Sequence, residues 1–254
     1  MDGRAGPWRA TVPPVLRRPI RWAGDLIDDR RVAQACAPIV RALAQDPAEV
    51  EWEDLVGRLA DAWGNPGWSA RAAYLRRVWK GARRARRGIL ECGSGLTTLV
   101  AHAATATSGT PVVSLEPLRR WRIRVGRALA AAGLHPKGVM AAPLRDHGDY
   151  DWYDVSAVPA ALSFDLVICD GPPGSTSGGR YGLLPVMRPR LSDDVRVLLD
   201  DADRAGERGA LERWRTDFGV MWETVPTGPG DAFAVVRLGP SAFDRGSGTD
   251  STPC

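Results

Sequence analysis

The stretch ILECGSGLTT, residues 89–98, joins a short apolar run to a glycine turn and the beginning of a helix. The apolar run predicts a buried strand that ends at the turn. Because Gly93 and Gly95 carry no Cβ, the backbone can approach a ligand closely there, and the helix start presents free N–H groups. The sequence therefore predicts a nucleotide-type binding turn between a strand and a helix.

Apolar runs alternate with amphipathic segments on the C-terminal side of this turn, at the spacing expected of βα units. We expect strands at 88–92, 111–115, 138–142, 164–169, 195–199, 219–224 and 232–237. Helices are expected at 97–106, 117–132, 182–190 and 205–217. In the second of these helices one buried stripe is predicted, made of Leu118, Trp121, Val125, Ala128, Leu129 and Ala132. The pattern predicts an α/β fold.

The N-terminal part has a different pattern. Residues 1–18 contain prolines and glycines and are expected to be irregular, whereas 25–87 has a helical period that the sequence GNPG at 64–67 interrupts. The last residues have too few apolar side chains to pack. The expected organisation is an irregular arm and helical extension over 1–70, one binding domain over 71–240, and a disordered tail over 241–254.

Composition fits one compact domain with an extension. The chain has 254 residues, of which 44% are hydrophobic, and a net charge of +4. It has no apolar run of about 18 residues and no apolar core near its start, so neither a membrane span nor a secretory signal is expected. The widely spaced cysteines, without metal-ligand spacing, predict reduced thiols in a cytoplasmic protein. These are Cys36, Cys92, Cys169 and Cys254.

The glycine turn suits two cofactors. A dinucleotide such as NAD or FAD and S-adenosylmethionine (SAM) both use such a turn, and Glu116 at the end of the next strand can accept the hydroxyls of an adenosine ribose. The dinucleotide-binding motif has a third glycine or an alanine at the position where this chain has Thr98. This difference argues against NAD as the cofactor. The alternative to a cofactor site is an ordinary tight turn between strand and helix, with Glu116 as a surface residue that binds no ligand.

The remaining segments favour SAM. Read in order, ILECGSGLTT, VVSLEP, AAPL, FDLVICDGPPG, GGRYGLLPV and VLLDDADRAGE resemble the class I SAM-dependent methyltransferase family over residues 68–218. The resemblance implies a Rossmann-like, doubly wound, seven-stranded and mostly parallel sheet with a reversed last strand. It also implies SAM as cofactor and a small-molecule methyl acceptor, with transfer to oxygen. The cofactor contacts that it implies are Glu91, Gly93, Gly95, Glu116, Leu144 and Asp170.

Three carboxylates follow two neighbouring strands. Asp170 ends one strand, and Asp200 with Asp201 ends the next. Such an oxygen-rich set suits Mg²⁺ and resembles the metal-dependent O-methyltransferase branch, although that branch commonly has an Asp-Asn pair where this chain has Asp-Asp. The alternatives are that these aspartates cap a helix or pair with an arginine, or that they work as an acid or base without metal.

Three residues are candidates for catalysis. Asp170 is the preferred base, His147 in the segment RDHGDYDWYD titrates in a useful range, and Arg180 in a glycine-rich flap can meet a carboxylate. His147 is otherwise a solvated loop residue. Four aromatic residues near these loops form either an acceptor pocket or a small core of their own. They are Tyr150, Trp152, Tyr153 and Tyr181.

Seven cations lie within residues 76–87. Arginines in this density can bind RNA phosphates, but they also suit the solvated face of a helix. We expect a small-molecule acceptor as partner, with homodimerisation left open and neither nucleic acid nor membrane. The alternative functions are an NAD(P)-dependent oxidoreductase and a non-catalytic or RNA-binding protein on the same fold.

Overall fold

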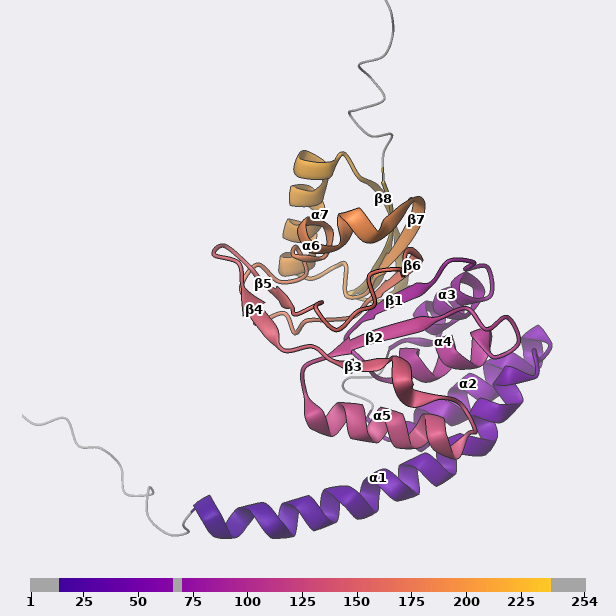
Figure 1. Ribbon diagram of the computed structural model, residues 1–254. Coiled ribbons are helices and arrows are strands. Elements are labelled where there is room, and N and C mark those ends of the chain that lie inside the picture. The colour runs from indigo at the N-terminus through magenta and orange to yellow at the C-terminus, as the bar shows by residue number, and fades with distance from the viewer. Residues whose placement is uncertain (1–13, 66–69, 239–254) are drawn as a thin grey trace, which may run out of the picture.

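The computed structural model describes residues 14–65 and 70–238. These residues form a mostly parallel sheet with helices on both faces (Figure 1). Its helices are α1 (Pro14–Ala44), α2 (Glu49–Trp63), α3 (Ala72–Ala82), α4 (Leu96–Thr105), α5 (Arg119–Ala131), α6 (Leu183–Met187) and α7 (Ala205–Phe218), with 3-10 turns η1 (Pro136–Gly138) and η2 (Arg188–Arg190). Its strands are β1 (Ile89–Cys92), β2 (Val112–Glu116), β3 (Val139–Ala141), β4 (Leu144–Asp146), β5 (Asp151–Tyr153), β6 (Phe164–Cys169), β7 (Leu191–Leu199), β8 (Met221–Gly228) and β9 (Asp231–Arg237).

Seven strands form the main sheet in the order β3-β2-β1-β6-β7-β9-β8. Strand β1 pairs in parallel with both β2 and β6, so the glycine turn that follows it lies at the middle of the sheet. Strand β9 runs antiparallel to both of its neighbours, β7 and β8. The predicted Rossmann-like, seven-stranded sheet with a reversed last strand is confirmed. Because the strand order changes direction beside β1, its carboxyl end borders the crevice in which such sheets bind ligands.

Alternating side chains of the central strands enter two separate cores. In β1, Ile89 packs among the helices α1 to α5, whereas Leu90 packs in the second core with α6 and α7. In β6, Ile168 and Val167 divide between the two cores in the same way. This period of two arises because successive strand side chains point to opposite faces. Helices therefore cover both faces, as doubly wound sheets require.

The N-terminal helices pack onto one face of this sheet. Helix α1 contacts α2, α4 and α5, and it crosses below them in Figure 1. Helix α2 buries four side chains at helical spacing and ends before Gly64, whose φ of +68° and N–H bond to Ala60 O close the helix. The predicted break begins there. Helix α1 begins at Pro14, so the expectation of irregular chain is wrong for residues 14–18, since proline is tolerated in the first turn.

Other differences from the predicted elements are local. The segment expected to be a loop around His147 forms a two-stranded hairpin, β4–β5, which Gly148 turns with a φ of +91°. Its strands are too short and polar to show an alternating pattern. Residues 1–13, the expected tail and Cys254 lie outside the described residues, and the other three cysteines are buried free thiols. No helix in the described ranges is long and apolar enough to cross a membrane.

Candidate active site

The glycine turn after β1 is held by backbone hydrogen bonds. Gly93 has a φ of +86°, which favours glycine, and its N–H donates to Leu115 O at 3.0 Å. A Cβ on Gly93 would lie 3.3 Å from Gly171 N, whereas a Cβ on Gly95 would have nothing within 4 Å. Gly95 therefore faces open space, and a ligand can approach its backbone.

This difference predicts separate effects for two alanine substitutions. Gly93→Ala should lower the free energy of unfolding by roughly 1–3 kcal/mol, because alanine disfavours the left-handed conformation and crowds Gly171. Gly95→Ala should leave stability unchanged and weaken ligand binding, because its methyl group enters the open space. Thermal unfolding and ligand titration of both variants check this. Equal loss of stability in the two variants would contradict it.

Glu91 lies beneath the turn. Its side chain is fully buried and accepts hydrogen bonds from Thr97 Oγ1 at 2.6 Å, from Thr98 Oγ1 at 2.7 Å and from the Ser114 hydroxyl. Burial raises the pKa of Glu91 to about 7, although these hydroxyls lower it. Glu91 does not line the cavity described below, so it supports the turn from behind. Thr98, where a dinucleotide fingerprint has glycine or alanine, contributes to this support.

Glu116 stands at the end of β2, beside the same turn. One carboxylate oxygen accepts from Ser94 N at 3.0 Å and Ser94 Oγ at 2.8 Å, and the other accepts from Leu118 N at 2.8 Å. The carboxylate is almost buried but lines the cavity. Since a carboxylate offers about four acceptor sites, one remains, and the Ser94 hydroxyl can yield a second. Glu116 can therefore accept a pair of ligand hydroxyls.

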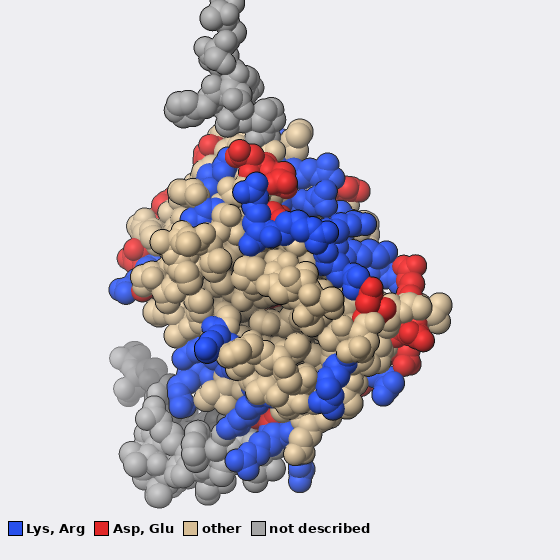
Figure 2. Space-filling view, turned by 45° about the vertical axis from the view of Figure 1, so that its right-hand side comes forward, with Lys and Arg blue, Asp and Glu red and all other residues tan. Residues whose placement is uncertain are grey.

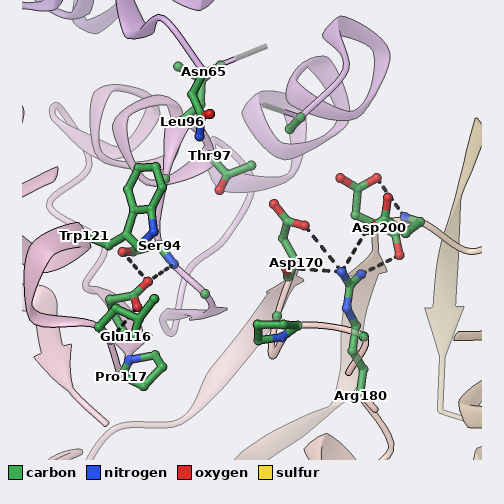
Figure 3. A pocket seen from close by; sticks show the side chains of 18 of the residues that line it. Asn65, Ser94, Leu96, Thr97, Glu116, Pro117, Trp121, Asp170, Arg180 and Asp200 are labelled. Atoms are coloured by element: carbon green, nitrogen blue, oxygen red, sulfur yellow. Dashed lines mark hydrogen bonds and ion pairs between the residues drawn. The ribbon is translucent and has the colours of Figure 1, made fainter. Parts of the chain in front are cut away.

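A cavity of about 1040 Å³ opens at the carboxyl ends of the strands. This volume lies at the upper limit of typical ligand sites, which leaves room for two ligands side by side. Figure 3 shows Ser94, Glu116 and Trp121 on one side of it, with Asp170, Arg180 and Asp200 on the other. Among the predicted site residues that line it are Gly93, Gly95, Glu116, Leu144, Asp170, Arg180, Asp200 and Asp201.

Two residues of the predicted buried stripe border the cavity instead. Leu118, which directly precedes α5, is 47% exposed, and Trp121 in α5 is half-buried and lines the wall near Glu116. The Trp121 ring stacks on Trp63 of α2, with a centroid distance of 6.1 Å, and the Arg124 guanidinium lies over the Trp63 ring at 4.8 Å. The helical period alone predicted both residues to lie in the core, because it does not show where a helix begins or where it extends beyond its neighbours.

The N-terminal extension also contributes to the wall. Cavity-lining residues from it are Asp28, Asp29, Trp63, Gly64 and Asn65. Arg124 forms ion pairs with both aspartates at 3.5 Å and so ties α1 to α5. These residues were not predicted from the sequence, because no local motif indicates that α1 and α2 reach the ligand side of the sheet.

Asp170 and Asp200 stand on neighbouring strand ends. Burial by the cavity walls raises the pKa of Asp170 to about 7, although Arg180 lowers it, while its side chain keeps 30% of its surface exposed. Burial, followed by the nearby charge of Asp170, raises the pKa of Asp200 to about 8. Both carboxyls therefore hold their protons to higher pH than a free aspartate does, and near neutral pH the two are not both ionised.

Arg180 lies between these strand ends and is only 2% exposed. It donates to the backbone oxygens of Cys169 at 3.2 Å, Asp200 at 2.6 Å and Asp170 at 3.2 Å, and to Asp201 Oδ2 at 2.9 Å. Although burial lowers its pKa, the Asp170 and Asp201 carboxylates raise it, so the guanidinium stays charged. The donors that Arg180 could offer a substrate are used within the chain, so it organises the site.

The predicted magnesium set is not formed. In residues 14–65 and 70–238 no three acidic, histidine or cysteine side chains are placed to hold a metal ion. Asp201 is engaged by Arg180 and by Arg204, whose Nη1 lies 2.7 Å from it. The strand ends that carry Asp170, Asp200 and Asp201 therefore enclose the Arg180 guanidinium. Asp201 pairs with arginine side chains, which was one of the alternatives to metal binding.

His147 does not reach the cavity. It is exposed at the tip of the β4–β5 hairpin, where its ring stacks on Tyr150 at a centroid distance of 5.0 Å. Of the four aromatic candidates, Tyr153 lines the cavity, while Trp152 and Tyr181 are buried in the core of that side. Trp152 and Tyr181 thus belong to the second core of the sheet and form no separate core of the loops, and the role of Tyr153 in an acceptor pocket stays a prediction.

Positive charge is unevenly distributed on the surface. Basic side chains gather in the upper right of Figure 2, with acidic side chains at the margins. Within the basic segment 76–87, three cations pair with acidic residues on the N-terminal side: Arg76 with Glu49 and Glu53, Lys80 with Glu49, and Arg83 with Asp46. Part of this segment thus fastens α3 to the extension.

Comparison with known proteins identifies the fold. No protein-family model and no curated protein matches the sequence. Among solved structures, the SAH-bound methyltransferase PaMTH1 of Podospora anserina is 16% identical, with a TM-score of 0.50 over 75% of this chain and 87% of that one. The cofactor-bound Rv0187 from MTB is 18% identical, with a TM-score of 0.51 over 70% and 85%.

A third structure agrees with these. The O-methyltransferase from Bacillus cereus in complex with SAH is 13% identical, with a TM-score of 0.50 over 76% of this chain and 92% of that one. The structural similarity establishes the fold, whereas sequence identities this low do not identify the methyl acceptor. Together with the strand order and the position of the cavity, they show that the chain has the class I SAM-dependent methyltransferase fold.

Proposed function

We propose that this protein is a SAM-dependent methyltransferase that methylates a hydroxyl oxygen of a small molecule. The observation that carries the proposal is the open turn at Gly95 beside Glu116, which together suit an adenosyl amino acid. The large cavity supports it, because it has room for cofactor and acceptor together.

The cofactor fits one side of this cavity. The Gly93–Gly95 turn would bind its amino-acid part, Glu116 would accept its ribose hydroxyls, and Leu144 would contact its adenine. When bound, SAM supplies a methyl group on a positively charged sulfonium. Glu91 would act indirectly by holding the turn from behind.

The acceptor would lie between the cofactor and Asp170. An aspartate with a pKa of about 7 can take the proton of an attacking hydroxyl near neutral pH. Asp200, whose pKa is about 8, would remain protonated there and could donate a hydrogen bond to the acceptor. Tyr153 would form part of the acceptor wall. Much of the rate enhancement in this displacement comes from alignment of the two reactants.

Calorimetric titration with S-adenosylhomocysteine (SAH), the demethylated cofactor, tests the proposal. We expect saturable binding of SAH and none of NADH, with no change on addition of Mg²⁺, because Arg180 occupies the position between the carboxylates. Binding of NADH without SAH would overturn the proposal in favour of hydride transfer. SAH binding justifies a screen of hydroxyl acceptors for SAH release.

A further inference from the structure

Glu207 faces the buried side of Arg180 and belongs to no part of the site described so far. It lies in the first turn of α7, is 2% exposed, and places Oε1 3.5 Å from Arg180 Nε. Its carboxylate also approaches the turn after Asp170, since a Cβ on Gly174 would lie 3.9 Å from Oε1. A carboxylate buried to this extent needs a partner, because leaving it unpaired costs several kcal/mol.

Counting the donors of Arg180 assigns that partner. A guanidinium has five N–H groups in a rigid plane. The two terminal nitrogens contact the backbone oxygens of Cys169, Asp170 and Asp200 and the side chain of Asp201, all at the ends of β6 and β7. The one remaining donor is Nε–H, which is buried and makes no hydrogen bond. The nearest charged acceptor is Glu207 Oε1 at 3.5 Å, which is also buried and accepts no hydrogen bond. Each is therefore the partner left for the other.

We propose that Glu207 is a positioning residue that fixes the plane of the Arg180 guanidinium and thereby the spacing of Asp170 and Asp200. A planar guanidinium that is held at Nε as well as at its terminal nitrogens cannot rotate. One that is held only by its terminal nitrogens can tilt about the Cδ–Nε bond, because delocalisation keeps the Nε–Cζ bond planar. Tilting would withdraw the charge from Asp170, whose Oδ1 is 3.5 Å from Nη2. Glu207 thus acts on Asp170 through Arg180. The inference rests on the proposed function only for the role that Asp170 plays.

Two substitutions separate this action from a simple effect of charge. Glu207→Gln removes the negative charge but keeps an oxygen that can accept from Nε–H, while Glu207→Met of similar length removes both. The other charged or titratable groups acting on Asp170 are unchanged in both variants: Arg180, Asp200, Asp201, Arg204 and Glu91. The readout is the titration of the Asp170 carboxyl, followed by carbon NMR with labelled aspartate.

Only Glu207→Met should raise the pKa of Asp170. In Glu207→Gln the pKa of Asp170 should fall or stay unchanged, because a negative charge is lost and Arg180 stays in place. In Glu207→Met it should rise by about one unit, because the guanidinium tilts away from the carboxylate. A fall in both variants would show that Glu207 acts only through its charge, and would overturn the proposal.

A second measurement begins with the unmodified protein, so its first result does not depend on whether the Met variant folds. The Arg180 Nε–H signal should be protected from solvent exchange there, and Glu207→Gln should keep more of this protection than Glu207→Met. Rapid exchange in the unmodified protein would overturn the proposal. Neither readout uses cofactor or acceptor, so failure to bind SAH would refute the proposed function and leave this inference standing.

Discussion

Asp170→Asn should lower the rate of methyl transfer at least about 100-fold and leave SAH binding unchanged. The size follows from the 10²–10⁴-fold contribution that a positioned general base typically makes. Asparagine keeps the shape of the side chain and a hydrogen-bonding oxygen, but it cannot take the proton of an acceptor hydroxyl. SAH release with an acceptor found by screening measures the rate, and calorimetry measures binding.

The pH dependence of the rate provides a second test of Asp170. Burial raises the pKa of this acid to about 7, so the base form is lost as pH falls below that value. The rate of the unmodified protein should therefore rise as pH passes about 7, and it should fall again above about pH 8, where Asp200 loses the proton that it would donate to the acceptor. The residual activity of Asp170→Asn should lack this rise. The matched control is Asp193→Asn, because the Asp193 side chain is 97% exposed and pairs with Arg188.

If Asp170→Asn kept the rate of the unmodified protein, Asp170 would not be the base. Loss of both SAH binding and activity would have a different meaning. It would place Asp170 in the cofactor contact set, as the sequence resemblance also implies, and would leave the identity of the base open.

Glu116→Ala should weaken SAH binding by about 10- to 100-fold. The reason is that ribose hydroxyls would donate to a charged carboxylate, and such hydrogen bonds contribute roughly 1.5–3 kcal/mol. The substitution also removes the hydrogen bonds that the N–H groups of Ser94 and Leu118 donate to the Glu116 carboxylate. Calorimetric titration measures the change in affinity, and thermal unfolding shows whether the turn remains intact.

The matched control for this variant is Glu212→Ala. Glu212 is a half-exposed helix residue that pairs with Arg215 away from the cavity, so its removal should not change SAH affinity. An unchanged affinity in Glu116→Ala itself would exclude Glu116 from the ribose contact.

Local sequence patterns determined the framework of this protein. The run Ile89–Cys92, followed by Gly93 and Gly95, placed the central strand, the turn and the following helix correctly, because backbone conformation there depends on residues adjacent in sequence. The order of strand ends likewise indicated that Glu116 and Asp170 would face one crevice, since parallel strands end at the same edge.

Tertiary structure decided what these residues can do. Asp201 was expected among metal ligands and instead pairs with arginines, because Arg180 from a distant flap enters between two strand ends. Glu91 was expected to contact the cofactor, but its carboxylate is buried behind the turn, where it accepts hydrogen bonds from three hydroxyl groups.

The composition of the cavity wall shows the same limit. Trp63 joins the wall from a helix that precedes the sheet in sequence. Sequence patterns of period two or 3.6 show which face of an element is apolar. Burial, pairing and pKa depend on which distant side chains meet, and those contacts exist only once the helices have packed onto the sheet.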